Sequence, residues 1–237
     1  MIDLNGKLGL HAAFRTKVEY VGAERAPVII VDDFLGAPEL LIESAACDAR
    51  FELSVDHYPG LRAAIPPIYS FALRAFLGKI IGETFGIAST DVIGGTCGYA
   101  IATTPAEKLS IVQRLPHFDS INPKQIALLH FLCPGEKGGT SFYRHRRTGY
   151  ETIDAARLAG YTAAVNGEIS AFGPPPMRYI DGDDAMFERI AAFDAAFNRV
   201  LIYRSASLHS AAIRPGFHFD ADPRTGRLTA NTLFIYR

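Results

Sequence analysis

The hydrophobic positions along the chain follow two different periods. The apolar run Val28–Val31 predicts a buried strand, and the residues after Pro38 show the spacing of one helical face. Residues 67–87 carry apolar positions three and four apart, which predicts an amphipathic helix that ends near Gly86. From about residue 91 the apolar runs become short and rich in β-branched and aromatic residues. The pattern therefore predicts helices followed by a mostly β region.

Six short segments are expected to form the strands of that β region. They are residues 97–104, 109–118, 126–132, 139–145, 199–206 and 226–237. Strands at this density predict a sandwich or barrel rather than alternating strands and helices. The sequence pattern therefore favours a jelly roll with the N-terminal helices packed on one side.

We expect a single domain over residues 1–237. Residues 1–90 are expected to support the barrel and residues 91–237 to form it, with an insertion at about 150–197. This insertion is less regular, and its Ala- and Phe-rich end predicts a helix from about Asp184 to Phe197.

The composition adds several exclusions. Hydrophobic residues make up 49% and charged residues 21% of the 237 positions, as in ordinary folded domains. A net charge of -1 provides no basic field for nucleic acid and no attraction to anionic membranes. No apolar run approaches the roughly 20 residues of a spanning helix, and the N-terminus lacks the features of a signal peptide. Three cysteines without a C-x-x-C pair predict a reducing, cytoplasmic setting.

The triplet His117-Phe118-Asp119 is the first candidate for chemistry. At a strand end, the two-residue period places His117 and Asp119 on one face, where both side chains can reach one metal ion. His209 is the best-placed third ligand, because it follows an apolar strand after a short turn. Two histidines and one carboxylate form the facial triad of non-haem Fe(II) oxygenases. The other histidines remain candidates, namely His11, His57, His130, His145 and His218.

The order of several motifs resembles a known family. "PHFDS", "ALLHFLCPGEKGGTSFYRHR", "NRVLIYRSASLHS" and "GRLTANTLF" resemble the 2-oxoglutarate/Fe(II)-dependent dioxygenases, in particular the prolyl-hydroxylase-like branch and a bacterial group of oxygenases of unknown function. The resemblance implies a double-stranded β-helix, with Fe(II) and 2-oxoglutarate as cofactors and His117, Asp119 and His209 as metal ligands. It also implies hydroxylation of a C–H bond with decarboxylation of 2-oxoglutarate to succinate. Related halogenases have a small residue in place of the carboxylate ligand, so Asp119 favours hydroxylation.

The same resemblance assigns the cosubstrate site. Arg227 is implied to bind the distal carboxylate of 2-oxoglutarate, since a planar guanidinium can form two parallel hydrogen bonds with it. Thr229 lies two residues further on, shares that face of the strand and can donate its hydroxyl. The interval from His209 to Arg227 is longer than is usual in the family, and His218 has the more typical spacing.

A tyrosine that contacts the cosubstrate is less clearly assigned. Phe131 and Cys133 occupy the strand in which relatives carry a "YLN" motif. The hydroxyl is therefore either missing or supplied by another tyrosine, with Tyr99 as the first candidate and Tyr143 and Tyr203 as alternatives.

The substrate itself is expected to be a small molecule or the side chain of a peptide or protein. Tyr143, His145 and Arg146 at the end of the 139–145 strand are candidates to contact it, and solvated strand-end charges are the simpler interpretation. The sequence does not specify an oligomeric state.

Each of these interpretations has an alternative. His117 and Asp119 are also typical of a surface turn, and Arg227 of a strand arginine paired with an acid such as Asp222. At the level of function, the alternatives are a cupin-type metalloenzyme that does not use 2-oxoglutarate and a catalytically inactive barrel that binds a ligand or a protein.

Overall fold

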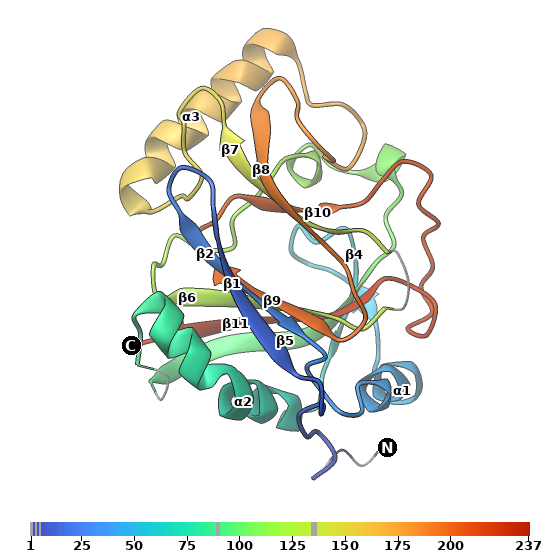
Figure 1. Cartoon of the computed structure of the whole chain (residues 1–237). Helices are drawn as coiled ribbons and strands as arrows, with labels where there is room; N and C mark the ends of the chain where they lie inside the picture. Colours follow the sequence, from blue (N-terminus) through green and yellow to red (C-terminus); the bar gives the residue numbers. More distant parts are fainter. Residues whose placement is uncertain (1, 3, 5, 89–90, 134–136) are drawn as a thin grey trace.

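The computed structural model describes the chain except for residues 1, 3, 5, 89–90 and 134–136, the last of which fall within the second motif quoted above. Eleven strands and three α-helices make up the described part (Figure 1). The strands are β1 (Arg15–Val21), β2 (Ala26–Asp32), β3 (Glu52–Leu53), β4 (Gly60–Ala64), β5 (Val92–Ala102), β6 (Gln125–Phe131), β7 (Gly139–His145), β8 (Phe187–Asp194), β9 (Arg199–Arg204), β10 (His209–Ala212) and β11 (Leu228–Tyr236). The helices are α1 (Glu39–Cys47), α2 (Ile68–Phe85) and α3 (Ala155–Phe172), with short 3₁₀ turns at Ala106–Lys108 and Val112–Arg114.

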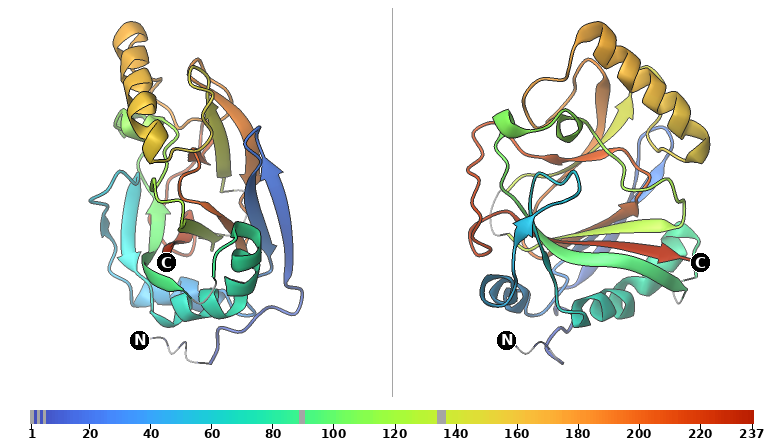
Figure 2. Two further views of the ribbon diagram at one scale, coloured as in Figure 1. Left: turned by 90° about the vertical axis from the view of Figure 1, so that its left-hand side faces the viewer. Right: turned by 180° about the vertical axis from the view of Figure 1, so that it is seen from behind.

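The strands form two antiparallel sheets. The large sheet has the order β1-β2-β9-β6-β11-β5-β4-β3, and the small sheet has the order β10-β7-β8. The blue pair β1–β2 and the cyan β4 lie at opposite sides of the molecule in the side view of Figure 2. Side chains of β2, β6 and β9 pack between the sheets against Phe142 of β7 and Phe193 of β8. The expected jelly roll with two facing sheets is confirmed.

The other face of the large sheet is covered by α1 and α2. Alternation along β6 divides the two faces, because Ile126 and Leu128 face the helices while Ala127 and Phe131 face the small sheet. Helix α2 contributes Leu73, among others, and ends where Gly86 adopts a left-handed backbone with φ 66°. The two predicted helices and their side of the barrel are therefore confirmed.

Two predictions about local structure were wrong. Residues 109–118 form no strand but a 3₁₀ turn followed by extended chain, in which His117 makes a single bridge. The helix expected over 184–197 is strand β8, which pairs with β7 along its length. Pairing with a neighbouring strand outweighed the helical propensity of its alanines.

The region 150–197 instead contains helix α3, which lies away from α1 and α2 (Figure 1). Asp154 caps its first turn by accepting a hydrogen bond from the backbone N–H of Arg157 at 2.9 Å. Tyr161 and Val165 bury one side of this helix against Tyr143 and Phe187.

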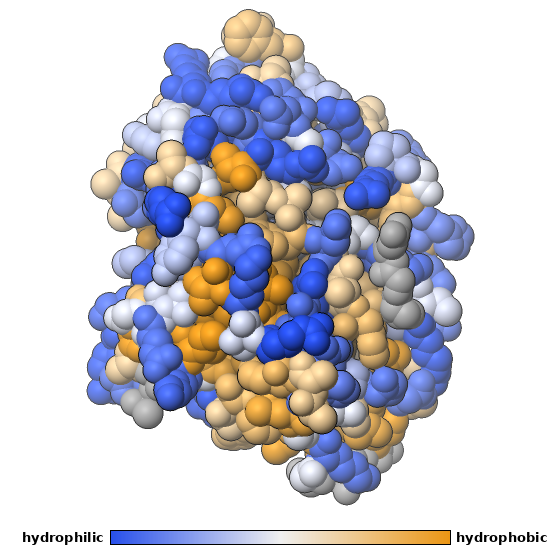
Figure 3. Space-filling view, in the orientation of Figure 1, coloured by the Kyte–Doolittle hydropathy of each residue, from blue (hydrophilic) through white to orange (hydrophobic). Residues whose placement is uncertain are grey.

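The exposed surface is mixed in character. On the face shown in Figure 3, hydrophilic residues cover most of the upper part and interrupt the hydrophobic residues in the middle. None of the helices in the described part of the chain has the length and apolar character needed to cross a membrane.

Candidate metal and cosubstrate site

His117, Asp119 and His209 converge at the edge of the small sheet. The backbones of His117 and His209 exchange two hydrogen bonds, of 2.9 and 2.8 Å, where His209 begins β10. The N–H of Asp119 donates to the carbonyl of Ser205 at 2.8 Å. Phe118 points the other way and packs near Tyr161. The two-residue period thus places His117 and Asp119 on one face even though this segment is not part of a named strand.

The ligand atoms of these three side chains lie within 4.8 Å of one another. Each histidine Nε2 is 3.8 Å from an oxygen of the Asp119 carboxylate, and the two imidazole rings are 4.3 Å apart. In the part of the chain that the structure describes, this is the one group of three or more His, Cys, Asp or Glu side chains that could hold a metal ion. A donor set of two imidazoles and one carboxylate suits Fe(II) and leaves coordination positions open.

A hydrogen bond to the backbone fixes the orientation of the His209 ring. Its Nδ1 lies 2.9 Å from the carbonyl oxygen of Ser207. Because a carbonyl can only accept, Nδ1 carries the proton, and Nε2 presents its lone pair towards Asp119. This second hydrogen bond is the usual way in which proteins orient a metal-binding histidine.

His117 completes the set as a neutral imidazole. Burial among protein atoms, followed by the charge of neighbouring His209, lowers the pKa of His117 to about 4, while Asp119 opposes the shift. The side chain still keeps 54% of its surface accessible. The ring therefore has many protein atoms around it but keeps one face open to solvent. The surrounding protein atoms, and not complete exclusion of water, lower its pKa. The neutral form is the one that binds metal.

Arg227 lies buried just before β11 and has no acidic partner among the described residues. Its Nε donates to the carbonyl of Lys137 and its Nη2 to the carbonyl of Gly139, both at 2.9 Å, and it packs over the ring of Phe131. The residue is 3% exposed. The proposed alternative pairing with Asp222 is not made. A buried cation is costly unless a counter-charge accompanies it, and the described residues supply none to this guanidinium.

Thr229 and Tyr203 also lie near Arg227. Thr229 is fully buried and faces β5 at Ala100, where its hydroxyl donates to the carbonyl oxygen at 3.3 Å. Burial raises the pKa of Tyr203 well above its usual value, Asp119 raises it further and Arg227 opposes the shift. The Tyr203 ring lies 4.9 Å from that of His209. Tyr203 therefore lies near enough to Asp119 of the His-Asp-His group and to Arg227 for both charges to affect its pKa.

Tyr99 lies on the opposite face of the sheet. Thr229 is opposite Ala100, so Tyr99, one residue before Ala100, points to the helices, where its hydroxyl donates to the carbonyl of Leu41 at 2.9 Å. The structure therefore brings Tyr203 to the site in place of Tyr99. Both tyrosines are candidates from the sequence, but only the pairing of the strands shows which one lies on the face of the large sheet that carries Thr229.

Residues 12–234 match the model of a family described as a family of unknown function, DUF6445. The chain belongs to this family. No curated protein matches the sequence.

Solved structures with a similar chain course include several non-haem enzymes. SnoK, an alpha-ketoglutarate-dependent carbocyclase from nogalamycin biosynthesis, is 14% identical, with 89% of this chain and 82% of that chain covered and a TM-score of 0.48. SnoN, an epimerase of the same biosynthesis, is 11% identical over 83% and 72% of the chains, with a TM-score of 0.44. EvdO2 from Micromonospora carbonacea var. aurantiaca, solved with 2-oxoglutarate, is 12% identical over 92% and 94%, with a TM-score of 0.45. Likenesses at this level carry no conclusion about activity, which has to come from the residues of the DUF6445 chain itself.

Tyr143, His145 and Arg146 do not meet the metal-binding group in this member of DUF6445. The hydroxyl of Tyr143 donates to the carbonyl of Ile180, and the buried His145 contacts Glu168 of α3 at 2.7 Å. Arg146 is exposed and pairs with Asp183 at 3.0 Å. These contacts place the three residues against α3 and the turn before β8 rather than around a substrate at the triad.

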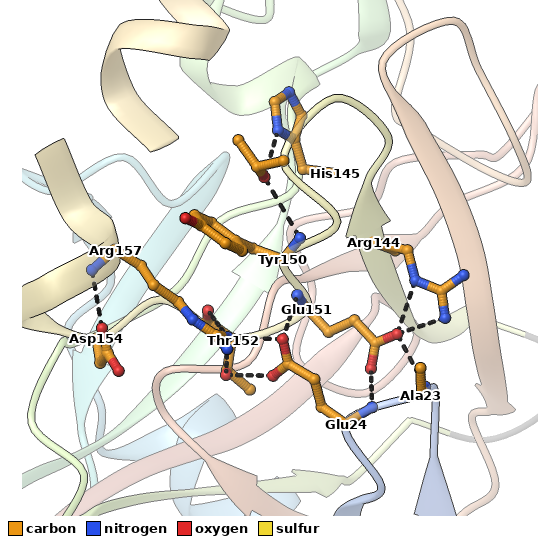
Figure 4. A network of polar contacts seen from close by, with 10 residues as sticks. Ala23, Glu24, Arg144, His145, Tyr150, Glu151, Thr152, Asp154 and Arg157 are labelled. Carbon is orange, nitrogen blue, oxygen red and sulfur yellow. Dashed lines mark hydrogen bonds and ion pairs between the residues drawn. The ribbon is translucent and has the colours of Figure 1, made fainter. Parts of the chain in front are cut away.

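Sequence reasoning missed a buried carboxylate beside the segment that leads to His209. Glu151 accepts hydrogen bonds from the backbone N–H groups of Ala23 and Glu24, both at 2.9 Å, and from Arg144 (Figure 4). The backbone carbonyl of Glu151 accepts from the N–H of Leu208, the residue before His209. The network therefore links the β1–β2 turn to the segment that positions the ligand. Nothing in the sequence distinguishes Glu151 from the surface acids.

Proposed function

We propose that this DUF6445 chain is an Fe(II)- and 2-oxoglutarate-dependent oxygenase that hydroxylates a C–H bond of a small molecule or of a peptide side chain. The observation that carries the proposal is the buried Arg227, which has no counter-charge among the described residues, together with the His-Asp-His group. A dicarboxylate that binds at both positions would satisfy the metal-binding side chains and the guanidinium together.

The roles of the residues follow from their contacts. His117, Asp119 and His209 would hold the iron, and the hydrogen bond to Ser207 keeps Nε2 of His209 directed at it. When bound, iron and 2-oxoglutarate would supply the oxidation of the C–H bond by dioxygen, in which one oxygen atom enters the substrate, the other enters succinate, and carbon dioxide is released.

Arg227 would anchor the distal carboxylate. Two of its nitrogens are already held by backbone carbonyls, which fix the plane of the guanidinium. Thr229, two residues further along the chain, could add a hydrogen bond if its hydroxyl turned from the carbonyl of Ala100 to the carboxylate. Each hydrogen bond to a charged group contributes about 1.5–3 kcal/mol. Asp119 and Arg227 both affect the pKa of Tyr203, so this tyrosine is a candidate to contact the cosubstrate.

The rival function is that of a cupin-type metalloenzyme that does not use 2-oxoglutarate. It would need the His-Asp-His group but not a buried guanidinium without a counter-charge. Arg227 therefore favours the oxygenase that uses 2-oxoglutarate, and loss of function in an Arg227 variant distinguishes the two.

The test measures succinate formed from 2-oxoglutarate with Fe(II) in air, together with anaerobic Fe(II) binding. We expect slow succinate formation by the wild type, none by His117→Ala or Arg227→Ala, and loss of Fe(II) binding only in His117→Ala. Arg146→Ala is the matched control, because this exposed arginine pairs with Asp183 far from the proposed ligands. Absence of Fe(II) binding by the wild type would refute the proposal, and metal binding without any 2-oxoglutarate binding would favour the cupin-type alternative.

A further inference from the structure

Tyr58 lies in the loop that joins β3 to β4, at the edge of the large sheet. The neighbouring residues of this loop, Val55, Asp56 and His57, are exposed, and the side chain of Val55 is completely so. The hydroxyl oxygen of Tyr58 is by contrast buried, and it has no hydrogen-bond partner among the described residues. A buried hydroxyl in this state costs about 1–3 kcal/mol, so its position needs a physical reason.

The conformation of Tyr58 is held by several contacts. Its backbone N–H donates to Asp56 at 2.9 Å, and its carbonyl accepts from the N–H of Gly60 at 2.9 Å. The guanidinium of Arg62 stacks over its ring at 4.7 Å. The adjacent Pro59 carbonyl accepts from the N–H groups of residues 103 and 104 at the end of β5. The loop thus holds the buried hydroxyl in place although no described protein group bonds to it.

The register of the sheet places Tyr58 near Arg227. Gly60 of β4 is opposite Ala102 of β5, and Leu228 of β11 is opposite Ile101. Arg227, one residue before Leu228, therefore lies level with Ala102, in line with the start of β4. The electrostatics agree: burial raises the pKa of Tyr58, and Arg227 is the strongest of the groups that oppose the shift.

The neighbouring polar groups are either occupied or belong to the proposed cosubstrate site. Tyr58 and Arg227 lie close enough to Tyr179 to affect its pKa. The hydroxyl of Tyr179 is however occupied, because it donates to the carbonyl of Thr104 at 2.7 Å. Thr229 also lies near Tyr58, without a well-formed hydrogen bond to it. Among the described residues, Tyr58 therefore offers an unused buried donor beside a guanidinium that has no counter-charge, an arrangement that suits a carboxylate.

We propose that the hydroxyl of Tyr58 donates to the distal carboxylate of the dicarboxylate bound by Arg227 and Thr229, and that this contact fastens the β3–β4 loop over the bound molecule. The inference rests on the proposed function and deepens it. Arg227 and Thr229 belong to the end of β11, whereas Tyr58 belongs to an exposed loop. Binding of the distal carboxylate is therefore coupled to the order of residues 54–59.

The first experiment compares two 2-oxo acids by anaerobic calorimetry with the Fe(II)-loaded protein. 2-Oxoglutarate carries the distal carboxylate, and 2-oxobutyrate lacks it. We expect Tyr58→Phe to weaken binding of 2-oxoglutarate about tenfold and to leave binding of 2-oxobutyrate unchanged, since only one hydrogen bond to a charged group is removed. Tyr20→Phe is the matched control, because Tyr20 is 55% exposed on β1.

The second experiment follows hydrogen–deuterium exchange of residues 52–62. We expect 2-oxoglutarate to slow exchange there in the wild type and in Tyr20→Phe but not in Tyr58→Phe. A wild type that does not bind 2-oxoglutarate would overturn the proposed function itself. If the wild type binds, two outcomes overturn the role of Tyr58 alone: unchanged affinity and protection in Tyr58→Phe, or an equal loss for both acids.

Discussion

Substitution of Glu151 by glutamine tests whether the buried network supports the metal-binding segment. The Glu151 side chain is 2% exposed, and its two oxygens serve different donors. Oε1 accepts from the N–H of Ala23 and from Arg144, and Oε2 accepts from the N–H of Glu24. In Glu151→Gln the amide oxygen can keep the first group, but the amide nitrogen then faces the N–H of Glu24 as a second donor.

The expected loss is the sum of two effects. The N–H of Glu24 loses its acceptor, which costs about 1–2 kcal/mol in a partly buried position. Arg144 loses a charged partner, a smaller effect because its side chain is 27% exposed and keeps Glu188. We therefore expect the free energy of unfolding to fall by about 2 kcal/mol, which corresponds to about 4–8 °C in Tm for a chain of this length.

Urea denaturation followed by circular dichroism measures this loss, and anaerobic Fe(II) titration measures its effect on the site. Glu188→Gln is the matched control, because Glu188 also pairs with Arg144 but is 39% exposed. We expect the control to change stability by less than about 0.5 kcal/mol. If Glu151→Gln is as stable as the control, the network does not have the supporting role described above.

Three further predictions concern the core, the acid stability and the cosubstrate site. Leu73→Ala should lower the free energy of unfolding by about 2–5 kcal/mol because Leu73 is fully buried in α2, whereas Phe71→Ala on the exposed side should cost far less, as urea denaturation would show. Burial lowers the pKa of His130 to about 4 from 6.5, so only the unfolded chain takes up its proton as the pH falls from 6.5 to 4; stability should decline in that window, less steeply in His130→Asn. An equal pH slope in the variant would contradict that assignment. Arg227→Lys keeps the charge but not the planar fork, so calorimetry should show at least about tenfold weaker 2-oxoglutarate binding with Fe(II) binding retained, and unchanged affinity would argue against the proposed anchor.

Local periodicity was sufficient for much of the architecture. The spacing of apolar residues predicted α1 and α2, and Gly86 marked the end of α2 because a glycine readily adopts positive φ. Short β-rich runs predicted β6, β7, β9 and β11 for the same local reason. The prediction failed at 187–194, where the alanine content suggested a helix. This segment is strand β8, because its conformation depends on pairing with β7 beside it.

The sequence by itself determined that His117 and Asp119 share a face, because extended chain alternates its side chains with a period of two whether or not it belongs to a sheet. Which distant residues join them was decided by the tertiary structure. The register of β11 against β5 turns Tyr99 to the helices, and the register of β4 against β5 brings the β3–β4 loop and Tyr58 level with Arg227. Register and packing depend on contacts between residues far apart in the chain, and no pattern within one segment contains them.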